Sequence, residues 1–229
     1  MSESRRTMAR RSSDSPSLSS PRPARTKPPG PDFSREAAWH QGGGGRIAGV
    51  DEAGRGPLAG PVVAAAVVLR PDRIPAGLDD SKKLGARQRE ELFEAILADA
   101  EVGIGTASAA EIDHVNIRQA TFLAMRRAIS ALANEPNHVL VDGRDIPTGC
   151  LVAATALIGG DALCLSIAAA SIVAKVTRDR IMTELCTCDP RYGFRQHMGY
   201  PTAAHVEALK VHGPGPHHRR TFGPVRALL

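Results

Sequence analysis

The sequence is poor in the residues that mark several common classes of protein. Phe, Trp and Tyr together make up only 3% of the 229 residues, so Ala, Val, Ile and Leu must build the core. The four cysteines form no Cys-x-x-Cys pair, which argues against a structural zinc site: Cys150, Cys164, Cys186 and Cys188. Plain thiols in a reducing compartment are the simpler interpretation, and we expect a cytoplasmic protein.

Long apolar segments are also missing. No run of about 18 apolar residues is present to span a bilayer. The N-terminus carries Ser, Arg and Pro in place of the apolar stretch of a secretory signal. We therefore expect no membrane partner.

Neither sign of charge is in clear excess over most of the chain, although the formal net charge is +5. Residues 1–45 carry eight Lys and Arg against four Asp and Glu, and the remainder carries 21 against 20. The basic balance is therefore almost wholly N-terminal. It gives little support for nucleic-acid binding by the body of the chain, where a basic footprint would have to be local.

Composition also divides the chain. Residues 1–45 are rich in Ser, Pro, Arg and Gly and end in four glycines. Such a segment buries too little apolar surface to offset its ordering entropy, so we expect it to be disordered. A basic tether for DNA is the less common alternative to a solvated tail. Residues 46–229 are expected to form one domain, including a small helical C-terminal part and tail from about residue 190.

Hydrophobic periodicity predicts an α/β fold. Apolar runs at 47–50 and 62–69 are separated by glycines and prolines, which favours an antiparallel hairpin. Further strands are expected at 101–108, 139–141 and 151–158, and helices at 86–99, 109–132, 166–186 and 202–211. Three antiparallel-type strands followed by strand–helix alternation indicate a mixed sheet with helices on its faces.

Four acidic residues follow predicted strands directly: Asp51, Glu52, Asp142 and Asp161. A single Asp after a strand is most often a turn residue or a helix cap. Strand ends of an α/β sheet converge on one edge, however, where ligands bind. If these strands are neighbours, the four carboxylates meet at one site.

Carboxylates packed together repel each other unless a cation lies between them. Oxygen ligands without a nearby His or Cys favour Mg²⁺ or Mn²⁺ over Zn²⁺. Magnesium usually shares its coordination shell with water and substrate phosphates. The acidic set therefore indicates phosphoryl-transfer chemistry.

A glycine-rich stretch, Asp-Glu-Ala-Gly-Arg-Gly-Pro-Leu-Ala-Gly-Pro, follows at 51–61. It has neither the GxGxxG pattern of dinucleotide sites nor the GK[ST] ending of a P-loop. Missing side chains let backbone groups approach a sugar-phosphate closely. Beside metal-binding acids, such a turn suits detection of a 2′-hydroxyl, the atom that distinguishes RNA from DNA.

This stretch resembles the ribonuclease HII family, and further motifs of that family follow in order at 80–84, 141–143, 160–179, 192–202 and 217–222. The resemblance covers roughly residues 46–225. It implies a ribonuclease H-like mixed five-stranded sheet flanked by helices, with a small helical C-terminal segment. Met198 departs from the family pattern, which has Lys in this late motif. The change removes a possible phosphate contact and no catalytic group.

The resemblance also implies roles for single residues. Asp51, Glu52 and Asp142 would be the metal ligands, and Asp161 the fourth active-site acid. The substrate-binding residues fall into three sets: the 2′-hydroxyl-reading turn (Gly54, Arg55, Gly56), the aromatic that stacks on the following sugar (Tyr200), and the phosphate contacts (Ser81, Lys82, Ser171, Lys175).

As a member of this family the chain would be a monomeric, metal-dependent endoribonuclease using two Mg²⁺ or Mn²⁺ ions. It would hydrolyse the RNA strand of RNA/DNA hybrids and cut 5′ to ribonucleotides embedded in duplex DNA. These activities serve ribonucleotide removal and RNA primer degradation. The competing interpretations are a type 3 ribonuclease H, a junction resolvase and a non-catalytic hybrid-binding module.

Several motif residues also have structural interpretations. Lys82 with Lys83 is typical of a solvated surface pair, and Tyr200 of a core aromatic with a wet hydroxyl. Arg178 and Asp179 suit a pair on a helix surface. The tail histidines His212, His217 and His218 are expected in solvent and not on a metal. Asp113 and Asp179 follow no strand and are left out of the metal set.

Overall fold

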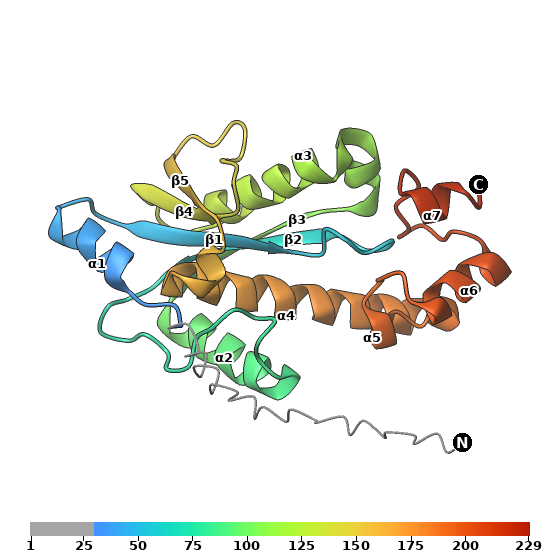
Figure 1. The fold of residues 1–229 in the computed structure, drawn as a ribbon, viewed down its shortest axis with the longest axis horizontal. Coiled ribbons are helices and arrows are strands. Elements are labelled where there is room, and N and C mark those ends of the chain that lie inside the picture. Colours follow the sequence, from blue (N-terminus) through green and yellow to red (C-terminus); the bar gives the residue numbers. More distant parts are fainter. Residues whose placement is uncertain (1–29) are drawn as a thin grey trace, which may run out of the picture.

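The computed structural model describes residues 30–229, and residues 1–29 lie outside it. The described chain forms a five-stranded sheet and seven α-helices with two short 3-10 helices (Figure 1). In chain order the elements are α1 (Ser34–Gln41), β1 (Ile47–Ala53), β2 (Val62–Val68), α2 (Ala86–Asp99), β3 (Glu101–Ala107), α3 (Ala109–Ser130), β4 (His138–Asp142), β5 (Ala153–Leu157), η1 (Gly160–Ala162), α4 (Leu165–Cys188), η2 (Pro190–Tyr192), α5 (Phe194–His197), α6 (Ala203–His212) and α7 (Gly223–Arg226).

The sheet is mixed and has the strand order β3-β2-β1-β4-β5. β1, β2 and β3 pair antiparallel, which confirms the predicted hairpin, whereas β1, β4 and β5 run parallel. β1 is longer than predicted because β2 offers it partners as far as the Ala53–Val63 pair. The acids at 51 and 52 therefore lie inside the strand, not after it.

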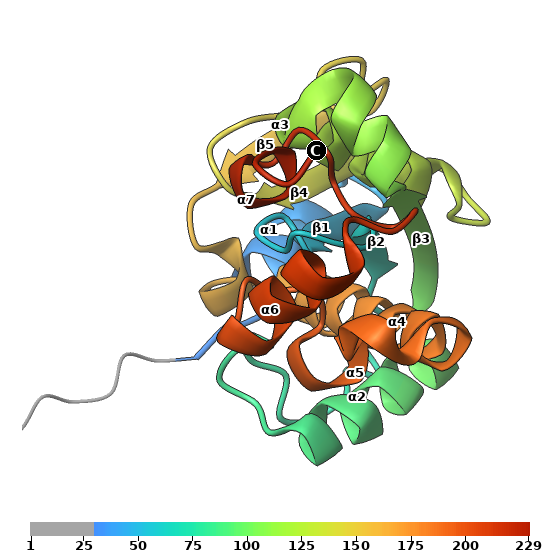
Figure 2. The same cartoon turned by 90° about the vertical axis from the view of Figure 1, so that its right-hand side faces the viewer.

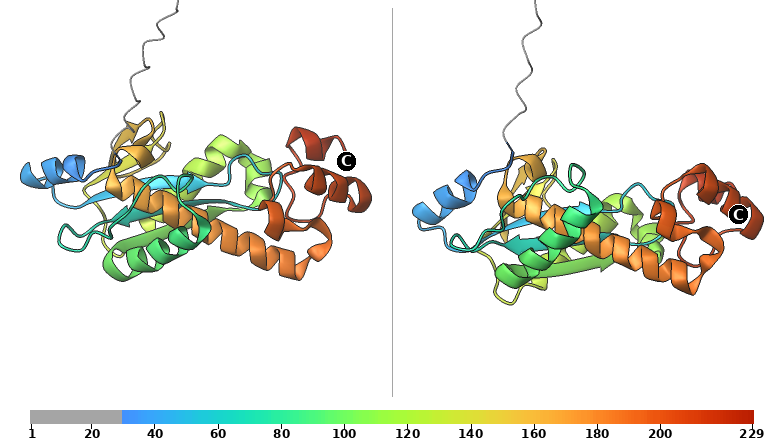
Figure 3. Two further views of the ribbon diagram at one scale, coloured as in Figure 1. Left: turned by 60° about the horizontal axis from the view of Figure 1, so that its bottom comes forward. Right: turned by 90° about the horizontal axis from the view of Figure 1, so that it is seen from below.

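Helices cover both faces of the sheet. α3 packs on one face, and α4 with α2 packs on the other (Figures 1 and 3). Because the core has few aromatic rings to fill space, the backbones of the helices lie close to the backbones of the strands. A Cβ at Gly103 or Gly105 in β3 would collide with backbone carbonyls of α3. Ala168, Ala169 and Ala170 of α4 are likewise fully buried against the opposite face. Small side chains thus allow a dense core with few rings.

The C-terminal helices α5, α6 and α7 gather at one end of the molecule (Figures 1 and 2). Their core includes Leu58, Met182, Phe194 and Leu209, so it joins the glycine-rich stretch to the end of α4. The predicted small helical C-terminal part is confirmed. Thr202 caps α6 as expected, because its side chain accepts a hydrogen bond from the His205 backbone N–H. None of the helices in residues 30–229 has the length and apolarity needed to cross a membrane.

The prediction that the whole of residues 1–45 is disordered is wrong for its last part, where α1 forms. Glu36 is fully buried and its Oε1 accepts hydrogen bonds from the N–H and hydroxyl of Ser166 at the start of α4. The Trp39 ring lies 4.5 Å from that of His138. These partners are about a hundred or more residues away along the chain, so local composition does not reveal them.

Candidate active site

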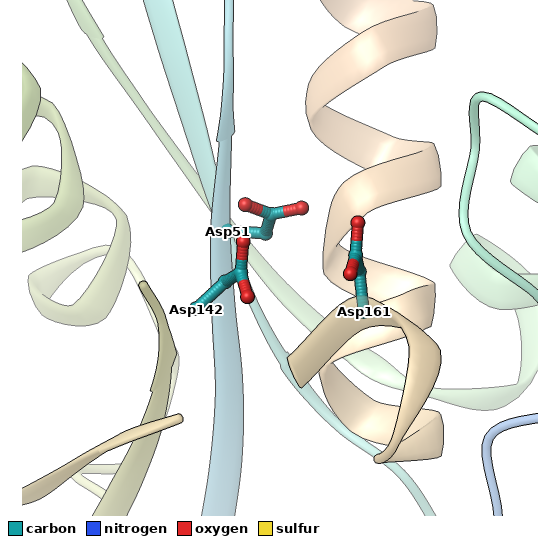
Figure 4. A group of neighbouring side chains, drawn as sticks. All are labelled: Asp51, Asp142 and Asp161. Atoms are coloured by element: carbon teal, nitrogen blue, oxygen red, sulfur yellow. The ribbon is translucent and has the colours of Figure 1, made fainter. Parts of the chain in front are cut away.

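Three aspartates meet at the edge where the parallel strands end. Asp51 comes from β1, Asp142 is the last residue of β4, and Asp161 lies in η1 after β5. Each offers one carboxylate oxygen within 4.8 Å of the others, and Figure 4 shows the three side chains pointing toward one another. β4 pairs with both β1 and β5 in parallel, so all three strands deliver their acids to the same edge.

Glu52 is near this group but not part of it. Successive side chains of a strand point to opposite faces, so Asp51 lies on the α4 side and Glu52 on the α3 side. The Glu52 carboxylate accepts a hydrogen bond from Arg55 Nη1 at 3.2 Å. Its charge raises the pKa of Asp51, and the charge of Asp142 raises the pKa of Glu52 itself. The role of Glu52 as a metal ligand stays a prediction.

The buried acids are held in an environment that disfavours their charge. Asp51 is 4% exposed, and burial together with the charges of Glu52 and Asp142 raises its pKa well above the ordinary value. Burial also raises the pKa of Glu52 and of Asp142, the latter against the hydrogen bond that Gly160 N–H donates to Asp142 Oδ1 at 2.7 Å. Such a set binds protons readily unless a cation is present.

One lysine offsets part of this charge. Lys82 Nζ lies 3.2 Å from Asp161 Oδ2 and 3.7 Å from Asp80 Oδ1. Lys82 is therefore oriented toward the acids and is not simply a solvated surface residue, although Lys83 pairs outside the site with Asp79. A single, largely exposed ammonium leaves most of the acidic charge uncompensated. The oxygen-only donor set fits Mg²⁺ or Mn²⁺.

A cavity of about 280 Å³ opens beside the acids. The residues lining it include nearly the whole predicted set: Asp51, Glu52, Gly54, Arg55, Gly56, Ser81, Lys82, Asp142, Lys175 and Tyr200. Two predicted residues do not line it: Asp161, which lies beside Asp51 and Asp142, and Ser171. Ser171 is buried behind Ser81, from whose N–H its hydroxyl accepts a hydrogen bond at 3.2 Å. Ser171 thus supports the 80–84 loop from within.

Tyr200 and the glycine turn face each other across this cavity. Tyr200 is 43% exposed, so its interpretation as a core aromatic is wrong. A Cβ at Gly56 would lie 3.7 Å from the Tyr200 ring. Gly54 has φ of 95°, and a Cβ there would collide with the Arg178 side chain. Glycine is therefore required at position 54 for both conformation and space.

Two buried arginines support the turn from behind, and the sequence did not reveal either role. Arg178, interpreted above as half of a surface pair, is 1% exposed and donates to the carbonyls of Pro61, Met198 and Ala59. Asp179 pairs instead with Lys175 at 2.8 Å. Arg219 is fully buried in a similar way. Their partners are backbone carbonyls, which leave no pattern in the sequence.

The tail histidines are only partly as expected. His212 is exposed, but His218 is 2% exposed, so its prediction as a solvent-facing residue is wrong. His218 Nδ1 accepts from Gly215 N–H, and its Nε2 lies 3.0 Å from His205 Nε2. Asp113 accepts hydrogen bonds from the N–H groups of Arg220 and Thr221. Both residues serve the tail and not the acidic site.

Comparison with known proteins agrees with this geometry. The family model described as ribonuclease HII matches residues 48–224. A ribonuclease HII of Magnetococcus marinus is 55% identical over 205 residues, which cover 88% of this chain and 96% of that relative. One of Azorhizobium caulinodans is 58% identical over 199 residues, covering 86% and 76%.

Solved structures give the same answer. The crystal structure of the ribonuclease H2 from Pyrococcus horikoshii OT3 matches with a TM-score of 0.68 and 30% identity, over 80% of this chain and 96% of that one. The family model, the relatives and the solved structure therefore agree over most of the described chain. The chain belongs to the ribonuclease HII family.

Proposed function

We propose that this chain is an endoribonuclease that hydrolyses the RNA strand of RNA/DNA hybrids and cuts 5′ to ribonucleotides embedded in duplex DNA. The observation that carries the proposal is the shared cavity. Asp51 and Asp142 line it together with a glycine turn and an exposed tyrosine, and the Asp161 carboxylate lies within 4.8 Å of theirs. Acids suited to a divalent cation and a turn suited to a ribose are thus combined in a ribonuclease HII chain.

Asp51, Asp142 and Asp161 would hold the metal, with Glu52 reaching the same edge from the other face of the sheet. When bound, two Mg²⁺ or Mn²⁺ ions would favour attack by water on the phosphodiester and neutralise charge on the leaving 3′-oxygen. The chain itself contributes positioning. Lys82, Ser81 and Lys175 line the cavity, where they suit phosphate oxygens. Tyr200 presents a ring face on which a sugar can stack.

The direct test is cleavage of a labelled DNA duplex containing one ribonucleotide, with Mg²⁺ or Mn²⁺ and with chelator. We expect one metal-dependent cut on the 5′ side of the ribonucleotide, leaving 5′-phosphate and 3′-hydroxyl ends. Asp142→Asn removes a charge with little change of shape and should lower the rate by orders of magnitude. Asp145→Asn is the matched control, since Asp145 pairs with Arg118 near the surface and should leave the rate unchanged.

Other products would indicate other functions. Cutting restricted to long hybrids would favour the specificity of type 3 enzymes. Cutting of branched DNA without ribonucleotides would favour a resolvase. Hybrid binding that added metal never converts into product would indicate a binding module. Near-normal cleavage by Asp142→Asn would remove the metal assignment.

We further propose that the catalytic domain comprises residues 46–229, with α1 packed onto it, and that the protein acts as a cytoplasmic monomer in ribonucleotide removal and RNA primer degradation. The absence of a membrane-spanning helix from residues 30–229 is compatible with this role. Sedimentation of the purified protein tests the monomer. A rise in genomic ribonucleotides on deletion of the gene tests the role in the cell.

A further inference from the structure

We propose that Arg219 is a positioning residue for ribose recognition: it holds the turn at residues 54–56 so that two backbone N–H groups face the substrate cavity. The inference rests on the proposed function, because it concerns how the same site distinguishes ribose from deoxyribose. Arg219 lies in the C-terminal segment, more than 160 residues from the turn along the chain.

The Arg219 guanidinium is occupied entirely with backbone carbonyls near the turn. Nη1 donates to Arg55 O at 2.8 Å, and Nη2 donates to Gly54 O. Nε and Nη2 both donate to Gly60 O, at 3.1 and 3.0 Å. In the part of the chain that the structure describes, no carboxylate forms a salt bridge with this side chain. Burial and the nearby Arg178 lower the pKa of Arg219 to about 9, so it remains charged at neutral pH.

The direction of these carbonyls fixes the direction of the neighbouring amides. In a trans peptide the C=O and the following N–H point to opposite sides, and the described chain has no cis peptide. The carbonyls of Gly54 and Arg55 face inward to Arg219. The N–H groups of Arg55 and Gly56 therefore face outward, where both residues line the cavity beside Asp51 and Tyr200. Neither N–H has a hydrogen-bond partner among residues 30–229.

Arg219 is itself held in place from two sides. Its own N–H donates to Leu58 O at 2.8 Å, and Gly60 N–H donates to His217 O at 2.9 Å. The next two residues, Arg220 and Thr221, donate their N–H groups to the Asp113 carboxylate of α3 at 2.8 and 2.9 Å. The tail thus links α3 to the turn. Arg219 is a fixed support and not a mobile surface side chain.

The chemistry of the guanidinium suits this task. It offers five N–H donors in one rigid plane, enough for three carbonyls at once. A lysine in the same place would satisfy fewer carbonyls, and glycines released from these bonds regain a wide range of conformations. The expected consequence is a turn that still folds but no longer keeps both N–H groups aimed at the 2′-oxygen.

The test compares Arg219→Lys with the unaltered protein on two duplexes that differ at one sugar, ribose or 2′-deoxy-2′-fluororibose. The fluorine keeps the sugar pucker but is a poor hydrogen-bond acceptor. We expect Arg219→Lys to lower the ribose-over-fluoro ratio of kcat/KM at least about tenfold, the scale of one lost hydrogen bond. Val225→Ala is the stability control, because Val225 is fully buried in the same C-terminal core and its side chain has no polar contact with the turn. It should lower Tm and leave the ratio unchanged.

The outcomes separate the two proposals. If the unaltered protein cuts both duplexes equally, the proposed ribose reading itself fails. If it discriminates and Arg219→Lys discriminates equally well, only the role of Arg219 is overturned. A loss of activity in proportion on both duplexes would also overturn it, since that marks a purely structural residue.

A second variant covers the case in which Arg219→Lys does not fold. Asp113→Ala removes the anchor of Arg220 and Thr221 from a half-exposed position on α3, so it loosens the tail without touching the buried core. It should shift the ratio in the same direction and speed hydrogen exchange of the Gly60 and Arg219 amides, whose bonds to His217 O and Leu58 O join the tail to the glycine-rich stretch. Unchanged exchange and an unchanged ratio in this variant would count against the proposal.

Discussion

At the scale of single residues, the acidic site opposes folding in the absence of metal. Asp142 lies beside Asp51 and Asp161, and the Lys82 ammonium forms a salt bridge with Asp161. Asp142→Asn keeps an oxygen to accept from Gly160 N–H while it removes one negative charge. Relief of repulsion between neighbouring charges is worth about 1 kcal/mol in a partly solvated site. The metal-free variant should therefore melt a few degrees above the metal-free parent.

Thermal melts with chelator and with Mg²⁺ check this prediction. Added Mg²⁺ should raise the Tm of the parent and leave Asp142→Asn nearly unmoved, because the cation binds only the complete set. Asp145→Asn should behave as the parent in both conditions. Equal shifts with Mg²⁺ in all three proteins would contradict the assignment of the site.

Single residues also show what the sequence was able to predict. The acids were identifiable because each comes after an apolar run in the sequence, and parallel pairing brings three of them to one edge as expected. Glu52 was expected to join them, but strand alternation turns it to the other face. Arg178 and Arg219 were missed because they bind backbone carbonyls. Every residue type has such a carbonyl, so the sequence contains no recognisable partner for either arginine. His218 was missed because its burial depends on where the tail returns.

At the scale of elements, the five strands and the helices α2, α3, α4 and α6 were predicted within a few residues. α5 and α7 were expected only as a small helical C-terminal part, and α1 was not predicted at all. Propensity and periodicity describe α2, β3 and α6 well, since their amphipathic or capped patterns are local. α1 has a weak pattern of its own and gains order from contacts with α4 and β4. Helices of this length depend on tertiary packing for stability.

The contact of α1 with α4 leads to a prediction on stability. Glu36→Ala removes the acceptor for the N–H and hydroxyl of Ser166, in the first turn of α4. Loss of these bonds should lower the free energy of unfolding by about 1–2 kcal/mol. The loss is limited to this size because the substitution also removes the second Glu36 oxygen, which is buried without a partner and costs desolvation energy. Urea unfolding measures the change. Glu135→Ala, at an exposed position, should cost almost nothing, and an equal effect of both variants would show that α1 does not stabilise the domain.

At the scale of the whole molecule, the C-terminal part is joined to the body through a chain of neutral histidines. His218 Nδ1 accepts from Gly215 N–H, so its Nε2 must carry the proton that bridges to His205 Nε2. His205 Nδ1 then donates to Tyr200 O at 2.9 Å. Every hydrogen bond in this chain requires an uncharged ring. The same chain connects the returning tail to the residue that lines the active-site cavity.

This arrangement makes the stability of the molecule depend on pH with a definite sign. Burial, followed by the repulsion that two protonated rings at His205 and His218 would exert on each other, lowers the pKa of His218 to about 4 from 6.5. Between these values the unfolded chain binds a proton at His218 and the folded protein does not. Its contribution to stability is therefore complete above pH 6.5 and is lost as the pH falls toward 4, by roughly 3 kcal/mol at most.

The raised pKa values of Asp51, Glu52 and Asp142 act in the opposite direction, because the folded protein then binds more protons than the unfolded chain. A comparison with His218→Gln cancels their effect, since the acids are common to both proteins. The charged or titratable groups that influence His218 are His205, His217 and Asp189, and they too remain in the variant.

We expect the stability difference between the parent and His218→Gln to shrink as the pH falls from 6.5 to 4. Chemical unfolding across this range measures it, with His114→Gln, an exposed histidine, as the control that shows no such change. A difference independent of pH would mean that His218 is charged in the folded protein, and the neutral chain from the tail to Tyr200 would then be wrong.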